Sequence, residues 1–198
     1  MKIGIIGAGN IGKALAKHLS YAGYETIISN SRRPESLTSV VKEIGNGLKA
    51  GTAAEAAAKD IVFLALPWNK LEEALAGLPQ WNNRIVVDAT NPILPGFVMA
   101  DLDGKTSSET VSDWVPGAKL VKAFNTILAA VLNSNPKEVG GSRVVFYSGN
   151  HDDAKKTVLE IINRSGFAGV DLGKLNEGGK LQQFPGGPLP TLNLIKLN

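Results

Sequence analysis

The hydrophobic pattern of the first half of the chain alternates between two kinds of segment. Short, mostly apolar runs are expected to be strands, because a strand buried on both faces is apolar throughout; they are Lys2–Ile6, Thr26–Ser29, Leu48–Gly51, Ile61–Leu66 and Arg84–Ala89. The segments between them carry apolar residues at helical spacing, and we predict helices at Asn10–Ala22, Pro34–Ile44, Ala53–Lys59 and Lys70–Ala76. This alternation predicts a parallel sheet with helices on both faces.

The second half continues the pattern less regularly. We predict helices at Ser107–Val115, Thr126–Asn133 and Asp152–Ser165, and strands at Lys119–Ala123, Arg143–Ser148 and Phe167–Leu172. Residues 173–190 are expected to be irregular but packed, because apolar residues stand between their glycines and prolines. The predicted fold class is α/β of the Rossmann type, a doubly wound, mainly parallel sheet with a small C-terminal elaboration.

A glycine-rich turn follows the first predicted strand and opens the first predicted helix. It reads Gly7-Ala8-Gly9-Asn10-Ile11-Gly12, and in this context G-x-G-x-x-G predicts a dinucleotide site. The first glycine makes the tight turn, the second lets a pyrophosphate approach the backbone, and the third lets the helix pack closely on the strand. The free N–H groups that open the helix favour the phosphates. A glycine turn without a ligand is the alternative.

A basic turn after the second predicted strand indicates which dinucleotide binds. NAD sites usually carry an acidic residue there, bonded to the ribose 2′-hydroxyl, whereas this chain has Ser31, Arg32 and Arg33. Glu25 lies at the start of the strand and is expected to point away. Two guanidinium groups and a hydroxyl suit a 2′-phosphate, so we predict NADP(H). The alternative is a solvated basic turn.

Three later segments are expected at the carboxyl ends of the strands, where such folds bind their ligands. Leu66, Pro67 and Trp68, and then Asn91, are candidates for the cofactor, and Asn125, Thr126 and Ile127 are candidates for the second substrate. Trp68 could instead simply cover the sheet edge. Asn91 could form an ordinary turn before proline, and the pair at 125–126 could cap a helix.

The composition narrows the chemistry. The chain has 198 residues without cysteine, which excludes thiol catalysis and disulfides, and only two histidines, far apart in sequence, so no metal site is predicted. His18 is expected on a helix surface, and no acid–base pair is evident, so no catalytic residue is assigned. Hydride transfer between a nicotinamide and a flavin-like ring does not require a protein acid or base.

Charge and hydropathy bear on partners and location. The net charge of +3 suits an anionic ligand. Lysines and arginines are scattered, so nucleic acid is not expected. No apolar stretch is long enough to cross a membrane. The apolar run at the N-terminus is too short for a signal peptide, so we expect a cytoplasmic protein.

Together the glycine motif, Ser31-Arg32-Arg33, Leu66-Pro67-Trp68 and Ala123–Ile127 resemble the F420-dependent NADP oxidoreductases, which are related to the cytosolic domain of the STEAP metalloreductases. The resemblance covers nearly the whole chain. It implies a homodimer that passes hydride between NADP(H) and a small redox acceptor, either the deazaflavin F420 or a flavin (FMN or FAD). It places residues 8–12 at the pyrophosphate, 31–33 at the 2′-phosphate and 125–127 at the acceptor ring.

The resemblance also has departures. Asn125 stands where the archaeal F420 enzymes carry histidine, and the segment 176–184 differs from theirs, so the acceptor stays open. We expect residues 1–123 to form the NADP-binding core and 124–198 an extension that packs on the same sheet and closes the acceptor site. A redox-sensing module that holds NADPH without turnover is the alternative. A β-hydroxyacid or imine reductase is disfavoured, because those enzymes usually append a large helical domain.

Overall fold

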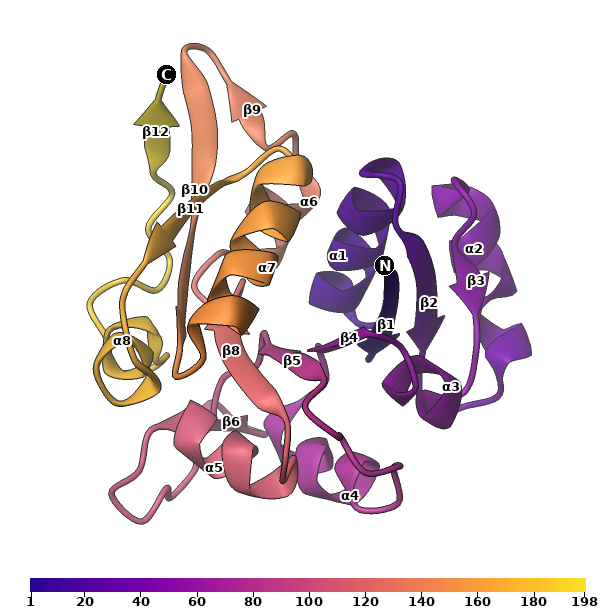
Figure 1. Ribbon diagram of the computed structural model, residues 1–198, viewed down its shortest axis with the longest axis horizontal. Coiled ribbons are helices and arrows are strands. Elements are labelled where there is room, and N and C mark those ends of the chain that lie inside the picture. The colour runs from indigo at the N-terminus through magenta and orange to yellow at the C-terminus, as the bar shows by residue number, and fades with distance from the viewer.

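The computed structural model describes residues 1–198 as one central sheet with helices on both faces (Figure 1). The strand order is β11-β10-β8-β5-β4-β1-β2-β3. Their bounds are β1 Lys2–Ile6, β2 Glu25–Ser29, β3 Lys49–Ala50, β4 Ile61–Leu64, β5 Ile85–Asp88, β8 Lys119–Ala123, β10 Gly141–Gly149 and β11 Ala168–Asp171. β2 and β3 lie on one side of β1, and β4, β5 and the later strands lie on its other side. The strand order therefore reverses at β1, and in such folds the ligand crevice opens at this point.

The helices and the remaining strands complete the fold. The helices are α1 Asn10–Tyr21, α2 Thr38–Ile44, α3 Ala53–Ala57, α4 Leu71–Leu75, α5 Ser107–Trp114, α6 Ala129–Asn133, α7 Asp152–Arg164 and α8 Leu175–Gln182, with 3₁₀ turns η1 Pro34–Leu37 and η2 Trp68–Lys70. A hairpin joins β6 Ile93–Leu94 and β7 Val98–Met99, and β9 Lys137–Glu138 and β12 Ile195–Leu197 pair with β10. None of the helices is long and apolar enough to span a bilayer.

Two apolar cores lie on opposite faces of the sheet, because successive strand residues point to opposite sides. In β1, Ile3 and Ile5 join a core of 26 buried residues that includes α1 and α7. Ile6 joins a second core of 16 residues with α3, α4 and α5. A Cβ at Gly4 would lie 2.0 Å from the Ala56 carbonyl oxygen, so this glycine lets α3 pack directly on β1.

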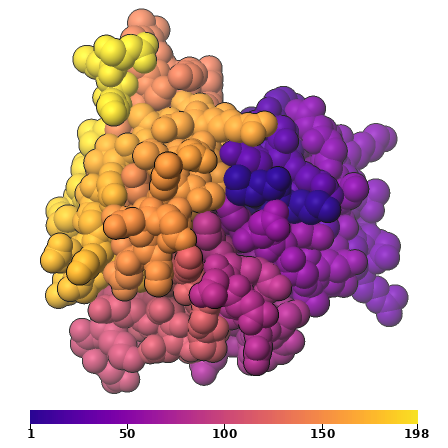
Figure 2. All heavy atoms as spheres, in the orientation of Figure 1, coloured from indigo at the N-terminus to yellow at the C-terminus, as the bar shows by residue number.

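The predicted α/β fold is confirmed, and β1 and β8 have the predicted bounds. Along the main sheet only β8 and β10 pair antiparallel, as expected for a mainly parallel sheet. Figure 2 shows the early residues on one side of the molecule and the later ones on the other, with the C-terminal residues at a projecting corner.

Two segments differ from prediction. Residues 126–128 are not helical, and the Thr126 carbonyl oxygen accepts instead from the Thr191 N–H at 2.7 Å. The tail contains α8, which the sequence did not predict because two glycines stand inside it. A Cβ at Gly178 would lie 2.5 Å from the Ser148 Cβ. The close packing of α8 on the sheet therefore outweighs the poor helix propensity of glycine.

The expectation that His18 lies on a surface is wrong. Its side chain is 9% exposed and packs edge-on against Phe167, with ring centroids 5.0 Å apart. Its Nε2 donates to the Leu132 carbonyl oxygen at 2.6 Å. Histidine occurs both at exposed and at buried positions, because its ring is partly apolar and partly polar. The sequence pattern alone therefore could not show that this ring is buried and bonded to the end of a neighbouring helix.

Candidate functional site

The glycine-rich turn between β1 and α1 is shaped by two close approaches of backbone. Gly7 has φ +115°, and a Cβ there would lie 2.1 Å from the Ala65 carbonyl oxygen. A Cβ at Gly12 would lie 2.0 Å from the Gly7 carbonyl oxygen. Gly9 differs, because a Cβ there would meet no heavy atom within 4 Å. The first and third glycines are therefore needed by the fold, and the second leaves open space at the surface.

The first turn of α1 presents unpaired donors to that space. Its first intrahelical bond runs from the Lys13 N–H to the Gly9 carbonyl oxygen at 2.9 Å. No side chain caps the helix and its first turn contains no acidic residue. The N–H groups of residues 10–12 therefore have no partner within the helix, and together with the helix dipole they favour an anion.

A cavity of about 750 Å³ lies over this turn, within the range of ligand sites in proteins. Its wall includes the predicted residues Gly7, Ala8, Gly9, Ser31, Arg32, Leu66 and Pro67. Lys13, Ser36 and Ser39 also line it, although none of them was among the predicted site residues. Lys13 and the two serines lie within one or two turns of the two motifs, so the motif positions could have indicated them.

The basic turn after β2 is held in place by Asn30. Its Oδ1 accepts from the Arg32 N–H at 2.9 Å, and its Nδ2 donates to the Ser36 Oγ at 3.0 Å. The Ser36 hydroxyl in turn donates to the Arg33 carbonyl oxygen at 2.7 Å. Arg32 lines the cavity, whereas Arg33 is exposed outside it. Glu25 lies at the far end of β2, 3.9 Å from Lys2.

Trp68 lies beneath the site. Its ring is buried against Trp114, with centroids 5.3 Å apart, in the core on the α4 face of the sheet. It does not line the cavity, unlike Leu66 and Pro67 before it. Asn10, at the opening of α1, borders a neighbouring groove, and Ile11 packs against the core on the α1 face.

The structure brings Asn91 and Asn125 together at the carboxyl ends of β5 and β8. The Asn91 Nδ2 donates to the Asn125 carbonyl oxygen at 3.0 Å, and the Asn125 Nδ2 donates to the Asn91 Oδ1 at 2.9 Å. The same Nδ2 donates to the Gln182 carbonyl oxygen at 2.7 Å. Phe124 has φ +65°, an uncommon conformation that costs free energy and tends to occur at functional sites. Thr126 and Ile127 are both buried.

Gln182, from α8, anchors this loop to the sheet. Its side chain is fully buried, accepts from the Ser148 Oγ at 2.7 Å and donates to the Phe146 carbonyl oxygen at 3.1 Å. Its role could not be predicted from the sequence, because these partners come from a strand more than thirty residues away. The amide pair is thereby connected to the centre of the molecule.

A buried ion pair supports the same edge from below. The Lys122 Nζ lies 3.0 Å from the Asp88 Oδ2, and both side chains are 0% exposed. Asp88 also accepts from the Ser108 hydroxyl at 2.8 Å and from the Thr90 N–H and hydroxyl at 2.9 and 2.7 Å. Lys122 donates further to the Thr90 carbonyl oxygen at 2.9 Å. A buried pair with its remaining donors and acceptors satisfied fixes the geometry around it, in this case the segment that carries Asn91.

Sequence comparison matches residues 2–92 to the model of the NADP oxidoreductases that depend on coenzyme F420. Metalloreductase STEAP3 of Rattus norvegicus is 26% identical over 190 residues, covering 96% of this chain and 37% of that protein. Human metalloreductase STEAP2 is 25% identical over 190 residues, covering 92% of this chain and 35% of that protein. The chain thus spans little more than a third of the length of the curated relatives it matches.

Solved structures are also similar. The hypothetical protein SMa0349 of Sinorhizobium meliloti is 49% identical, with a TM-score of 0.93 over 99% of this chain and 96% of that one. A candidate F420-dependent NADP-reductase of Arthrobacter sp. FB24 is 27% identical, with a TM-score of 0.73 over 88% and 86%. A reductive aminase of Aspergillus terreus, solved with NADPH, is 19% identical with a TM-score of 0.63 over 90% and 56%, a likeness of fold alone.

Proposed function

The chain belongs to the F420-dependent NADP oxidoreductase family, related to the STEAP metalloreductases, and we propose that it transfers hydride between NADP(H) and a flavin-like ring. The ring is that of the deazaflavin F420 or of a flavin such as FMN or FAD. The observation that carries the proposal is the cavity that joins the glycine turn to Arg32 and Pro67. Its dimensions and charge suit a phosphorylated dinucleotide.

The residues present fit NADP(H). The open space at Gly9 leaves room for a pyrophosphate beside the free N–H groups of α1. Ser31 and Arg32 offer a hydroxyl and a guanidinium to the 2′-phosphate at the far end of the same cavity. Leu66 and Pro67 line the wall that leads toward the carboxyl ends of β4 and β5. The reduced nicotinamide supplies the hydride when it is bound.

The polar groups at the acceptor end suit positioning rather than proton transfer. Asp88 and Lys122 are fully buried and bonded to each other, so they hold the segment around Thr90 instead of meeting a substrate. Both N–H groups of the Asn125 amide are bonded, to Asn91 and Gln182, so the Asn91 Nδ2 is the amide of this pair with a free N–H, which can donate to a carboxamide or a ring carbonyl. Hydride transfer between two rings depends mainly on their alignment. This arrangement supports a ring acceptor.

The described activities of similar proteins indicate which acceptors to consider. The Arthrobacter protein is described as F420-dependent, and the curated relatives are metalloreductases. We therefore propose that the hydride acceptor of this chain is one of two ring types, a deazaflavin or a flavin, and that NADPH is the hydride donor. The same set of residues would serve either ring, because both are flat and carry carbonyl groups.

An anaerobic acceptor panel tests the proposal. NADPH oxidation is followed with F420, FMN, FAD and a ferric chelate offered in turn, with NADH as the comparison donor. We expect turnover with at least one ring acceptor and a clear preference for NADPH. Tight binding of NADPH without oxidation by any acceptor would contradict the proposal and indicate the redox-sensing module instead.

A further inference from the structure

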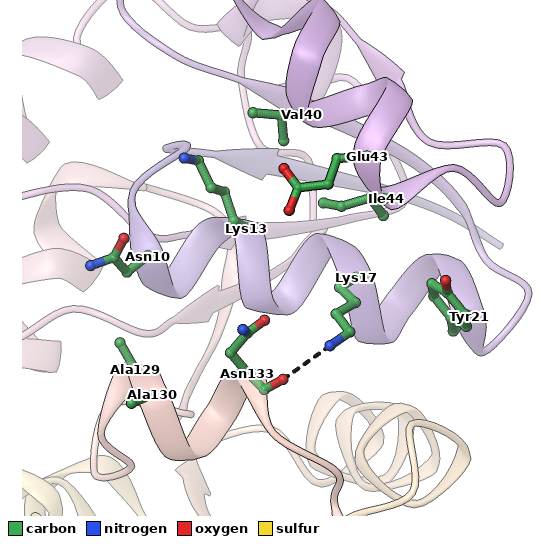
Figure 3. Close-up of a pocket in the computed structure, with 10 residues that line it drawn as sticks. All are labelled: Asn10, Lys13, Lys17, Tyr21, Val40, Glu43, Ile44, Ala129, Ala130 and Asn133. Atoms are coloured by element: carbon green, nitrogen blue, oxygen red, sulfur yellow. Dashed lines mark hydrogen bonds between the residues drawn. The ribbon is translucent and has the colours of Figure 1, made fainter.

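A second hollow runs beside the dinucleotide cavity, along the outer face of α1 (Figure 3). It has a volume of about 380 Å³ and lies between α1, α2 and α6. One stripe of α1 forms its floor, with Asn10, Lys13, Lys17 and Tyr21 spaced so that they share a helix face. We call this hollow the α1 groove. Nothing in the proposed cofactor site uses its distal half.

The α1 groove carries unbalanced positive charge. Lys13 and Lys17 line it, and neither forms an ion pair with any carboxylate of the chain. The one acidic side chain that lines it, Glu43, comes from the opposite wall on α2. Two ammonium groups against one carboxylate leave a net positive hollow, which favours an anionic ligand.

Lys17 is held in a fixed place in the groove. Its Nζ donates to the Asn133 carbonyl oxygen at 3.1 Å, which ties α1 to the end of α6 (Figure 3). An ammonium group has three donors, so two remain for a ligand. Its side chain is half-buried. A lysine already ordered by one bond loses less conformational entropy when it binds a second anionic group.

The groove adjoins both halves of the proposed reaction site. At one wall Lys13 and Val40 also line the dinucleotide cavity. At the other wall stand Ala129 and Ala130, which follow the acceptor segment 125–127 almost directly. Both are small and uncharged, so this wall adds no carboxylate to the groove. The groove is therefore connected to the acceptor segment by this closeness along the chain, since α6 begins two residues after Ile127.

We propose that the α1 groove binds the phosphorylated side chain of the hydride acceptor, with Lys17 contacting the phosphate. This inference rests on the proposed function and adds a chemical requirement to it: the acceptor is a flavin-like ring whose ribityl chain carries a phosphate, as a monoester, a diester or part of a diphosphate. FMN, FAD and F420 share that chemistry. The same ring without phosphate would fill the ring site and leave the groove unused.

Matched ligand pairs test the groove without depending on turnover. One pair is FMN and riboflavin, and the other is F420 and its phosphate-free deazaflavin analogue. The dissociation constant of each is measured from ring fluorescence with the full chain saturated with NADP⁺. We expect at least one phosphorylated member to bind about tenfold or more tightly than its partner, the size of one charge-assisted contact. The pair that shows the difference identifies the ring.

The variant Lys17→Met removes the charge and keeps most of the apolar stem. We expect it to lower the preference for the phosphorylated member of the pair to near unity, and Lys17→Arg to restore most of it. Lys156→Met is the control, because Lys156 is an exposed lysine on α7 outside the groove, and it should leave the preference unchanged. Lys13 is unsuitable, since it also lines the dinucleotide cavity. Unchanged NADP⁺ affinity verifies that each variant is folded.

Two failures are distinguishable. If the rings bind but the phosphate makes no difference, or if Lys17→Met and Lys156→Met behave alike, the groove is not a phosphate site and the proposed function is untouched. If no ring of either kind binds to the NADP⁺-loaded chain, the proposed function fails, and the inference fails with it.

Discussion

At the scale of single residues, the three glycines of the first turn have separable roles. Gly12 is enclosed by backbone, while Gly9 faces open space in an extended conformation, φ −74° and ψ −170°, that alanine also adopts. The G-x-G-x-x-G spacing predicted both positions. The structure adds which of them serves the fold and which leaves space for a ligand.

Gly12→Ala and Gly9→Ala therefore have opposite effects. The first pushes a methyl group into the Gly7 carbonyl oxygen and should lower the free energy of unfolding by about 1–3 kcal/mol, as overpacking does. The second should keep wild-type stability and lose NADPH affinity, because its methyl group occupies the pyrophosphate space. Urea unfolding and NADPH titration measure the two effects. Equal loss of stability in both variants would show that the distinction is wrong.

Arg32 and Arg33 could not be ranked from sequence, because either can face a phosphate beyond β2. The structure places Arg32 on the cavity wall and Arg33 outside it. Arg32→Ala should weaken NADPH binding by about 1–3 kcal/mol for the lost charged contact, with little change for NADH. Arg33→Ala is the matched control and should lose less. An equal loss for both nucleotides in Arg32→Ala would refute the assignment to the 2′-phosphate.

At the scale of elements, local patterns predicted most helices and strands but not those that depend on distant partners. β1 and β8 were predicted with their bounds because both are short runs made mostly of apolar residues. α8 was missed because Gly178 and Gly179 lower its intrinsic propensity, and only its packing on the sheet compensates. The contact of α1 with α6 was also missed, since it depends on His18 and the Leu132 carbonyl oxygen.

This contact makes stability depend on pH. Burial lowers the pKa of His18 below 6.5, and the charge of Lys17 adds to the shift, while the bond to Leu132 opposes it. As the pH falls below 6.5 the unfolded chain binds a proton at His18 and the folded chain does not. The free energy of unfolding therefore decreases as the pH falls from 6.5 toward the lower pKa that His18 has in the folded chain.

We expect His18→Gln to show a shallower loss of stability than wild type as the pH falls below 6.5. Urea unfolding at several pH values measures the slope. His151, which is exposed, supplies the control variant His151→Gln, and its slope should match wild type. Parallel curves for wild type and His18→Gln would contradict this account of the α1–α6 contact.

At the scale of the whole molecule, the alternation of strands and helices predicted a mainly parallel sheet and the edge at which the site lies. It could not predict that β10 runs antiparallel to β8, because an apolar run has the same appearance in either direction. β9 and β12 are two and three residues long and pair only with β10, so they carry no signal of their own.

We also propose a homodimer, as the family resemblance implies, and the fully exposed Val139 beside β9 is a candidate contact.

The amide network shows the same limit for the site. Asn91 and Asn125 were both selected from their places after strands, but their mutual bonds and their support by Asp88, Lys122 and Gln182 follow from the folded sheet. Candidate ligand-binding residues can be found from local motifs. The residues that fix their positions cannot, because they come from distant parts of the chain.

Single-turnover hydride transfer tests the central claim most directly. The enzyme is mixed without oxygen with the ring acceptor it binds and with NADPH that carries deuterium at one or the other C4 position of the reduced nicotinamide. The account predicts that acceptor reduction is slowed by deuterium at one of these positions only, because the bound rings align one face of the nicotinamide. Reduction at the same rate with both labels, or no reduction although NADPH and the ring are both bound, would contradict it.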